Sequence, residues 1–515
     1  MKRIIITFYL FCSLSFLYAQ NLISIGQKID GSDLKAECFH FNENIQTFSI
    51  DPSSKYLCLK FRGLTKNGKY WKNKGLIGLY DIKEHKLLWK NSINYSTSNS
   101  FCTDNGVVVY STTSSIFYDI KTGHIIWKND IYPAYINDSL NIVIGYKNAH
   151  SSKLYATTLD KGISLWETKI SHKYGWNNNY KLSPTKRLII ADNIHCLNLL
   201  TGENLTYNIQ SGGPNMKGLL LQGVVMMAGA MAGAAVSGGG YYGTYVPMSG
   251  NNVITDMVSN VIEKNSCFYI ADRKNIMCLD SLLNPIWKHE ISNKMASHSS
   301  LIFNKDRLFM LNYGYGRANG GSLTAKGLPF IAEFDSKTGK EISFNLFSDK
   351  KEIIKDAAIN NNSFYILFNN RLTYQNIHDS IVNTKEWDVT KYGNLIRLLP
   401  DTIYIFNPEQ KTFKPISYDG TNCLVYSDQH QAYLVDTNLN IKANYSNDLI
   451  YIPEIRLKDY FCIRKNNDFW FIHKLGLPIA HFQLDLQRGI AVGNKLLMLT
   501  ANNDLIYLDL DEAIN

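Results

Sequence analysis

The sequence predicts an all-β protein built from tandem copies of one pair of strands, and three observations support this. Residues 116–127 read as an alternating strand, a polar turn closed by Thr122 and Gly123, and a second strand ending at Trp127. Weaker copies recur from about residue 75 to the C-terminus, and no helix of convincing length is expected outside one apolar insertion. Strand repeats with a period near 40 residues are typical of β-propellers. We therefore predict a β-propeller of about eight or more blades.

The N-terminus has the features of a secretory signal peptide. Lys2 and Arg3 form a charged segment, and residues 4–17 form an apolar segment shorter than the ~20 residues needed to span a bilayer. Ala19 completes an acceptable cleavage site that leaves Gln20 as the new N-terminus. We therefore predict a signal peptide over residues 1–19 and a propeller over residues 20–515.

The leader and the net charge limit the classes of compartment and partner. Cys12 lies inside the apolar segment without the small preceding residue that a lipoprotein signal needs, so we expect a soluble periplasmic or secreted protein. Removal of Lys2 and Arg3 leaves 51 of the 53 basic residues against 44 acidic ones, a net charge of +7. This excess is dilute over the chain, and no basic run resembles a nucleic-acid footprint.

The clearest copies of the repeat carry a tryptophan at one strand position. Trp89, Trp127 and Trp166 lie 38 and 39 residues apart, close to the period of a propeller blade. The fourth copy has Tyr207 one residue later, and Phe344 shows the same shift. Because a large aromatic side chain can fill the seam between neighbouring blades, we expect these residues to be buried and structural.

The turn of the repeat carries an acid, which we expect to bond turn amides, and a glycine, which we expect at positive φ. A looser copy at residues 436–440 has asparagine in place of glycine, and asparagine also tolerates positive φ. The repeat positions that we expect to be structural are Asp81, Trp89, Asp119, Gly123, Trp127, Gly162, Trp166, Gly202, Tyr207, Trp287, Asp335, Gly339 and Asp436.

About ten hairpins follow one another along the chain, more than the four to eight blades of most propellers. We favour one ring over two smaller propellers, because no linker rich in proline and serine divides the copies. The chain ends just after the strand that would precede an outermost one. Residues 21–41 could supply that missing strand and so hide a sheet edge.

The pattern of residues 118–127, with Asp119, Gly123 and Trp127, resembles the quinoprotein-like (PQQ-like) β-propeller repeat, a blade type of WD40-like architecture. The resemblance is clear over residues 76–207 and looser afterwards. Members of this family include quinone-dependent dehydrogenases and, as a non-enzyme, the propeller lipoprotein of the outer-membrane barrel-assembly machine. Fold does not choose between these functions.

No catalytic, cofactor or metal site is predicted. The resemblance to the dehydrogenases would imply two adjacent cysteines beside the quinone and an acidic, calcium-holding centre, and the sequence has neither. The twelve histidines show no H-x-H, H-E-x-x-H or His/Cys grouping. The cysteines beyond the leader include no C-x-x-C, which favours buried core thiols over a disulfide framework.

Two glycine-rich segments depart from the repeat. Residues 313–321 interrupt a hairpin, with Arg317 and Lys326 nearby. We interpret this segment as a long surface loop in preference to a phosphate or carboxylate cradle, because no helix N-terminus frames it.

The second segment is an apolar insertion over residues 211–255, in which residues 218–255 contain no Asp, Glu, Lys, Arg or His. Met, Ala and Leu favour a helical or irregular structure over residues 219–236, and two glycines at G-x-x-x-G spacing allow close helix approach. We expect this segment to pack on its own propeller, with membrane insertion or partner docking as the alternative. The candidate contact residues are Leu219, Val224, Met227, Gly229, Gly233 and Val236.

The sequence therefore favours an exported propeller that acts as a protein-binding or assembly scaffold in the cell envelope. Its partner would be an unknown envelope protein or a membrane surface in contact with residues 218–250, with no nucleic acid and no cofactor. A quinone-dependent or other propeller enzyme is one alternative. A carbohydrate-binding module is another, because the chain has 32 tyrosines that could be exposed.

The mature protein is predicted to begin at Gln20 and to carry no lipid, because the apolar segment is short and Ala19 completes a cleavage site. Intact-mass measurement and N-terminal sequencing of the exported protein check this. Retention of residues 1–19, or a lipidated cysteine, would contradict it.

Overall fold

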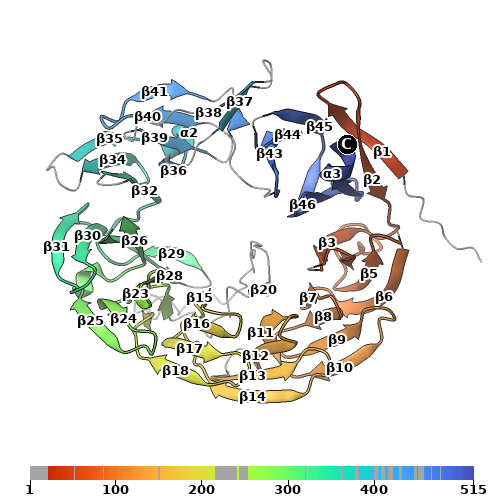
Figure 1. The fold of residues 1–515 in the computed structure, drawn as a ribbon, viewed down its shortest axis with the longest axis horizontal. Coiled ribbons are helices and arrows are strands. Elements are labelled where there is room, and N and C mark those ends of the chain that lie inside the picture. The colour runs from red at the N-terminus through yellow and green to blue at the C-terminus, as the bar shows by residue number, and fades with distance from the viewer. Residues whose placement is uncertain are drawn as a thin grey trace, which may run out of the picture. The chain divides into compact units, whose positions relative to one another are not determined.

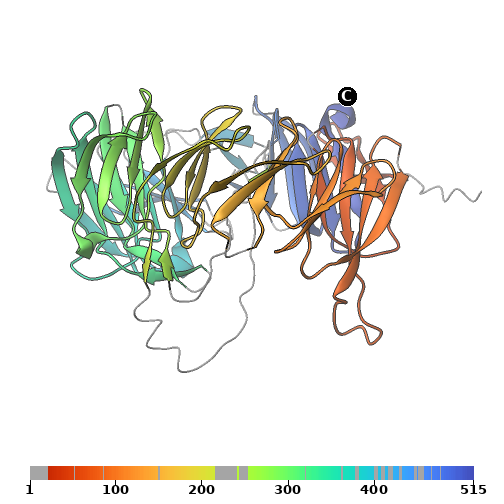
Figure 2. The same cartoon turned by 90° about the horizontal axis from the view of Figure 1, so that it is seen from below.

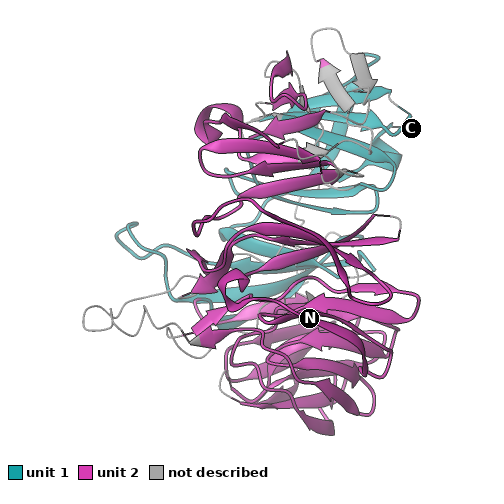
Figure 3. Ribbon diagram, turned by 90° about the vertical axis from the view of Figure 1, so that its left-hand side faces the viewer, with its two compact units in different colours: residues 1–95, 452–515 teal, residues 96–451 magenta. Residues whose placement is uncertain are grey.

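The structure of the protein is a computed structural model that describes residues 21–514, apart from residues 52, 85, 149–150, 215–240, 243–252, 305, 319–320, 361–362, 377–381, 399–403, 408–411, 416–421, 428–431, 446–448, 451–456, 466 and 476. The predicted signal peptide, residues 1–19, and most of the predicted insertion lie outside the described residues. The chain divides into two compact units, which Figure 3 colours separately. Unit 1 comprises residues 1–95 and 452–515, and unit 2 comprises residues 96–451.

The described part of unit 2 contains seven antiparallel sheets, each with four strands in the pattern of a propeller blade (Figure 1). In order along the chain they are β7–β10 (Asn99–Cys102, Gly106–Tyr110, Ser115–Asp119, Ile125–Asn129); β11–β14 (Tyr132–Asn137, Ile142–Tyr146, Lys153–Thr158, Ser164–Lys169); β15–β18 (Asn178–Lys181, Lys186–Ile190, Ile194–Asn198, Asn204–Tyr207); β22–β25 (Ile262–Lys264, Cys267–Ala271, Asn275–Leu279, Pro285–Glu290); β26, β27, β30 and β31 (Ser299–Asn304, Arg307–Asn312, Phe330–Asp335, Glu341–Leu346); β32–β35 (Asp356–Asn360, Ser363–Leu367, Arg371–Asn376, Val382–Glu386); and β36, β39, β40 and β41 (Leu395–Leu398, Cys423–Tyr426, Ala432–Val435, Ile441–Asn444).

Two smaller sheets in unit 2 interrupt this pattern. One joins β19 (Gly213–Pro214), β21 (Val253–Thr255), β28 (Tyr315–Ala318) and β29 (Ser322–Ala325), and the other joins β37 (Tyr404–Asn407), β38 (Thr412–Pro415) and β42 (Leu449–Ile450). A further short strand, β20 (Tyr241–Tyr242), pairs with β11. The described residues of the predicted insertion therefore form short strands that pair with the rest of unit 2.

The core of unit 2 lies in the seams between consecutive sheets. In the first seam, Val108 and Phe117 pack with Ile136 and Val143 of the next sheet. The same alternation of sheet and apolar seam continues along the unit. Inner strands such as β8 and β12 are buried along their whole length, whereas the outermost strand β14 alternates between exposed and half-buried residues. Burial on both faces explains why the inner strands read as continuous apolar runs.

Unit 1 contains three further sheets of the same pattern, so the fold class predicted from the sequence, an all-β β-propeller with eight or more blades, is confirmed. One sheet is β3–β6 (Ile45–Ile50, Tyr56–Phe61, Lys74–Asp81, Lys86–Asn94). The other two are β43–β45 (Tyr460–Lys465, Asp468–His473, Pro478–Gln483) and β46–β48 (Leu486–Val492, Lys495–Thr500, Leu505–Asp509). Each of these last two has three strands from the C-terminal part of the chain.

The N-terminal hairpin supplies the fourth strand of both C-terminal sheets. Strand β2 (Asp33–Phe39) pairs with β48, and β1 (Asn21–Lys28) pairs with β45, which joins the two sheets into one of eight strands. A Cβ on Gly26 would collide with the backbone of His481, so β1 can approach β45 this closely only with glycine at that position. The prediction that residues 21–41 complete the last sheet is confirmed.

Three seams of unit 2 share one contact, in which the indole of one sheet lies on the turn of the next. Trp127 Nε1 donates a hydrogen bond of 2.6 Å to the carbonyl oxygen of Leu159, and a Cβ on Gly162 would lie 2.7 Å from the indole. Gly162 also has φ +65°, so both its backbone conformation and its lack of a side chain are required. Trp166 lies in the same way on Leu199 and Gly202, and Trp287 on Ser336 and Gly339.

Two other turns of unit 2 have leucine at the position that glycine occupies in these three seams. Leu283 and Leu439 adopt φ +65° and +63°, and both side chains are buried. The interpretation that asparagine replaces glycine in residues 436–440 is therefore wrong, because Leu439 takes the positive φ. The preceding outermost strands, β18 and β35, contain no tryptophan. Leu283 packs into a seam without tryptophan, whereas Leu439 shares its seam with Trp387, which follows β35.

Helices are few and short in the described part of the chain: η1 (Asn293–Met295), α2 (Val389–Tyr392) and α3 (Leu510–Ile514). Asp388 caps α2 by accepting hydrogen bonds from the backbone nitrogens of Thr390 and Lys391. Among the described residues, none of these helices has the length and apolar character needed to cross a membrane.

Replacing Trp127 with alanine is expected to lower the free energy of unfolding by about 3–5 kcal/mol, the range for a buried large aromatic side chain. Gly162→Ala is expected to destabilise as well, because the new methyl group meets the indole. In the double variant that collision is absent, so its loss of unfolding free energy should be smaller than the sum of the losses in the two single variants. Thermal melting of the four proteins measures this coupling, and strictly additive losses would contradict the seam contact.

Candidate functional site

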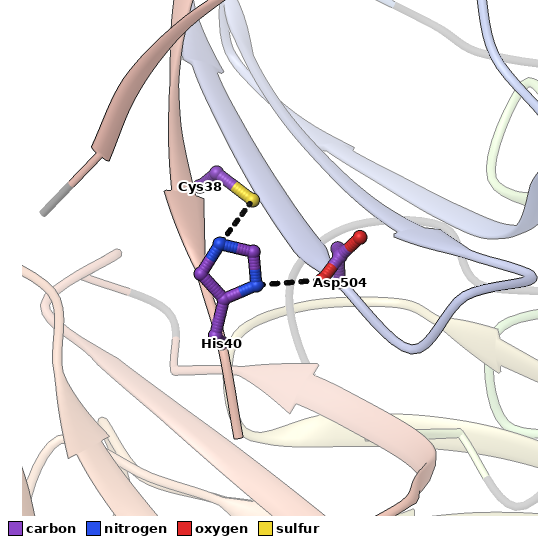
Figure 4. A group of neighbouring side chains, drawn as sticks. All are labelled: Cys38, His40 and Asp504. Atoms are coloured by element: carbon purple, nitrogen blue, oxygen red, sulfur yellow. Dashed lines mark hydrogen bonds and ion pairs between the residues drawn. The ribbon is translucent and has the colours of Figure 1, made fainter. Parts of the chain in front are cut away.

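The strongest grouping of reactive side chains lies in unit 1, where β2 meets β48. Cys38 is on β2, His40 follows that strand, and Asp504 precedes β48. The pairing of Cys38 with Ile506 and of Phe39 with Leu505 brings these three side chains together. Figure 4 shows the imidazole of His40 between the thiol and the carboxylate. In the described part of the chain this is the one group of three side chains placed to share a metal ion.

The three side chains form a hydrogen-bonded chain. His40 Nδ1 lies 2.7 Å from Asp504 Oδ1, and His40 Nε2 lies 3.7 Å from Cys38 Sγ. A carboxylate can only accept a hydrogen bond, which places the imidazole proton on Nδ1 and leaves Nε2 to accept from the thiol. Cys38 is buried, whereas the side chain of His40 is 55% exposed. The imidazole thus links an interior thiol to a surface carboxylate.

The electrostatics favour a protonated thiol. Burial, together with the nearby charge of Asp504, raises the pKa of Cys38 to about 11 from its usual value of 9.0. Reactive cysteines have the opposite surroundings, which are electropositive and partly exposed. The sequence order Cys, His, Asp therefore has the components of a nucleophilic triad without the activated thiolate that such a triad needs.

The same atoms could bind a soft divalent metal only if the thiol lost its proton. Sγ and His40 Nε2 would then be the two ligand atoms, and Asp504 would orient the ring through Nδ1. Structural zinc sites use four protein ligands, so two ligand atoms make an incomplete donor set. The geometry is best described as a latch, Cys38–His40–Asp504, that ties the N-terminal strand to the turn before β48.

The expectation that no histidine and cysteine lie together is wrong at this position. Cys38 and His40 are two residues apart on extended backbone, so their side chains lie on the same face of the strand. The spacing of Cys38 and His40 in the sequence could therefore have predicted that their side chains lie close together. Asp504 gave no such signal, because it is 464 residues from His40.

The sequence-predicted acids lie in turns, where they bond backbone amides. Asp119 Oδ1 accepts from the backbone nitrogens of Lys121 and Thr122 and from the Thr122 hydroxyl. Donation by Thr122 holds the pKa of Asp119 below its usual value of 3.8. Corresponding backbone contacts are made by Asp81 to Glu84, by Asp335 to Lys337 and Thr338, and by Asp436 to Asn438 and Asn440.

The sequence-predicted aromatics lie on outermost strands. Trp89, on β6, is 8% exposed, and Trp127 and Trp287 are buried to a similar degree. Trp166 is half-buried, and Tyr207 packs against the seam that contains Leu283. The expectation that Phe344 is buried is wrong, because its side chain stacks on Phe330 but is 40% exposed. The turn glycines Gly123, Gly162, Gly202 and Gly339 all have positive φ. None of the thirteen repeat positions belongs to the Cys38–His40–Asp504 latch.

The glycine-rich segment at residues 313–321 contains a paired strand. Residues 315–318 form β28, which pairs with β21 and β29, so the interpretation of residues 313–321 as a long loop is wrong. Arg317 Nε donates to Asp256 Oδ2 at 2.9 Å, and His298 Nδ1 lies 3.1 Å from the other oxygen of that carboxylate. The guanidinium is thus already paired with an acid of its own unit.

The candidate contact residues of the apolar insertion, Leu219, Val224, Met227, Gly229, Gly233 and Val236, all lie outside the described residues. All eight cysteines of the described residues are free thiols, and only Cys267 is not fully buried.

No protein-family model matches the chain, and no curated protein matches it. The chain is similar to the solved structure of BamB from Moraxella catarrhalis at 11% identity and a TM-score of 0.33, over 95% of this chain and 99% of that one. A eukaryotic initiation factor is similar at 12% identity and a TM-score of 0.33, over 82% and 95%. KlHsv2 with its loop 6CD replaced by a Gly-Ser linker is similar at 10% identity and a TM-score of 0.27, over 78% and 99%. These similarities carry no argument about activity or partner.

Cys38 is expected to resist alkylation in the native protein, because a pKa about two units above the usual value lowers the thiolate fraction roughly a hundredfold. Peptide-resolved mass spectrometry after treatment with iodoacetamide measures this, with half-exposed Cys267 as the internal comparison. Unfolding should abolish the protection. Modification of native Cys38 faster than Cys267 would show instead that the thiol is activated.

Proposed function

We propose that the protein is an exported scaffold of the cell envelope that holds a partner protein along the outermost strand β31 of unit 2. Three apolar side chains of that strand, Ile342, Phe344 and Leu346, are 58%, 40% and 42% exposed. They alternate along the strand and therefore lie on one face. This exposed apolar row is the observation that carries the proposal.

The backbone of β31 is open on one side, because the strand pairs only with β30 among the described strands. Proteins usually protect a sheet edge with charge, proline or a covering segment. Here the row of three carries no charge, and the nearest acid on the strand, Glu341, lies 3.6 Å from His289 of the neighbouring sheet. An apolar edge of this kind suits an extended partner segment that adds a strand and places alternate side chains against the row.

Exposed aliphatic side chains recur at the equivalent position of other sheets in unit 2. Each lies three residues after the turn residue with positive φ and is between 45% and 58% exposed, and the set is Ile126, Leu165, Leu205, Ile286 and Ile342. A side chain that the fold needed only for its core would be covered by the next sheet. The recurrence supports a binding role for the outermost strands as a set, with β31 as the most apolar member.

Three finer assignments belong to this proposal. The repeat is of the quinoprotein-like type, on the evidence of Asp119, Gly123 and Trp127 and their copies. Residues 1–19 direct export to the periplasm or the medium. Residues 218–250 offer a second contact to an envelope protein or a membrane surface.

A photo-crosslinking amino acid at position 342 tests the proposal in intact cells. We expect one protein partner to be captured at 342 and none at 282. Position 282 is the control, because Leu282 is 63% exposed but lies on a turn of the same unit and not on an outermost strand. Ile342→Lys should abolish capture from position 346 while leaving the melting temperature unchanged, since substitutions of exposed side chains have small effects on stability. Equal capture at 342 and 282, or none at 342, would contradict the proposal.

The absorbance spectrum of the purified protein separates the scaffold from a quinone-dependent enzyme, because a bound quinone would be visible in it. Glycan-array binding tests the carbohydrate-binding alternative on the same preparation.

A further inference from the structure

The hairpin that connects β4 to β5 in unit 1 has a composition unlike the rest of the chain. Over residues 62–74 it carries five basic residues and no acidic one, a formal charge of +5, whereas the whole chain carries +9 over 515 residues. The basic residues are Arg62, Lys66, Lys69, Lys72 and Lys74. The four lysines are exposed, and no ion pair joins them to a carboxylate of the described residues. We refer to residues 62–74 as the basic finger.

The basic finger holds its own shape. Leu64 and Trp71 form an antiparallel bridge, and the backbone nitrogen of Thr65 donates to the carbonyl oxygen of Tyr70. Nearer the sheet, the nitrogen of Lys72 donates to Gly63, and Arg62 Nε donates to the carbonyl of Lys72. These bonds make the segment a defined projection, which Figure 2 shows extending beyond the edge of its sheet.

The apolar side chains of the finger lie on its two arms, between the turn at residues 66–69 and the sheet. Tyr70, Trp71 and Leu64 are 68%, 41% and 41% exposed, although they belong to residue types that fold into the interior elsewhere in this chain. An exposed tryptophan, tyrosine and leucine on one ordered hairpin, surrounded by unpaired lysines, do nothing for the core of unit 1. Lys66 and Lys69 lie in the turn, and Lys72 and Lys74 lie towards the sheet, so positive charge flanks the apolar side chains on both sides.

We propose that the basic finger binds the surface of an anionic lipid bilayer. Tryptophan and tyrosine rings are favoured at the level of the lipid headgroups, where their apolar parts enter the acyl boundary and their polar atoms stay in water. The lysines on both sides of these rings would then lie against anionic headgroups, each adding about fivefold to binding while the surface is within a Debye length. A nucleic acid or an acidic peptide would use the lysines but would leave the aliphatic Leu64 without a partner.

This inference does not depend on the scaffold role. The finger belongs to unit 1 and the exposed row of β31 to unit 2, and neither includes residues 218–250. Loss of partner capture at β31 would therefore leave membrane binding unaffected, and the reverse also holds.

Vesicle flotation of the full mature protein tests the proposal, with phosphatidylcholine vesicles that contain or lack phosphatidylglycerol. We expect binding to the anionic vesicles and little binding to the neutral ones, with a loss on raising the salt concentration. Lys66→Glu/Lys69→Glu/Lys72→Glu and, separately, Tyr70→Ser/Trp71→Ser should each weaken binding at least tenfold. Matched controls should bind like the parent protein: Lys121→Glu/Lys337→Glu/Lys340→Glu for charge, and Leu475→Ser/Leu477→Ser for exposed apolar area in unit 1.

A fluorescence measurement tests membrane contact with a variant that stays folded. Anionic vesicles should shift the emission of the parent protein to shorter wavelength, and Trp71→Phe should remove that shift while the melting temperature is unchanged. Absence of vesicle binding would overturn the proposal. The proposal would also be overturned if Tyr70→Ser/Trp71→Ser bound vesicles as well as the parent while the triple lysine variant failed on vesicles and on heparin alike. That result would identify a general polyanion site.

Discussion

The indole ring that lies on a turn glycine of the next sheet is the contact on which unit 2 depends. Each of these sheets has apolar side chains on both faces and cannot bury them alone. The ring covers the outer end of a seam, and its N–H satisfies a turn carbonyl that would otherwise be buried without a partner. The contact therefore fixes the spacing of consecutive sheets and the conformation of the turn at once.

The leucine turns show that the constraint is on the filled seam and not on one residue type. Where the preceding strand has no tryptophan, Leu283 or Leu439 reaches into the seam from the opposite side. Positive φ is costly for leucine, about 1 kcal/mol or more, so burial of its side chain has to offset the strain. At the Leu439 turn, Asn383 and Lys385 of the preceding strand also donate to the turn carbonyls. A turn glycine under an indole and a buried turn leucine are therefore two ways to fill a seam, and at the Leu439 turn the leucine packs together with Trp387.

The sequence predicted those parts of the fold that repeat and missed those that form once. The strand, turn and tryptophan of residues 116–127 were recognisable because copies reinforce one another, and the need to cover a last sheet edge pointed to residues 21–41. The pairing of β28 was hidden because its glycine-rich sequence has no strand propensity, and pairing with β21 decides its conformation. The latch combined one readable signal, the spacing of Cys38 and His40, with Asp504, which only tertiary structure brings near. The positive φ of the leucine turns ran against local preference, so no local rule could have found it.

The double use of the N-terminal hairpin sets the order in which unit 1 can be completed. Strands β1 and β2 leave the ribosome first, yet their partners β45 and β48 are synthesised last. Two sheet edges and the buried side of β2, including Cys38, stay uncovered until almost the whole chain is available. Folding of unit 1 thus depends on strand pairing between the two ends of the chain, which contact order predicts to be slow and which leaves the strands open to mispairing in the meantime. A chain shortened by a few residues at its C-terminal strand would lose its first strands as well as its last.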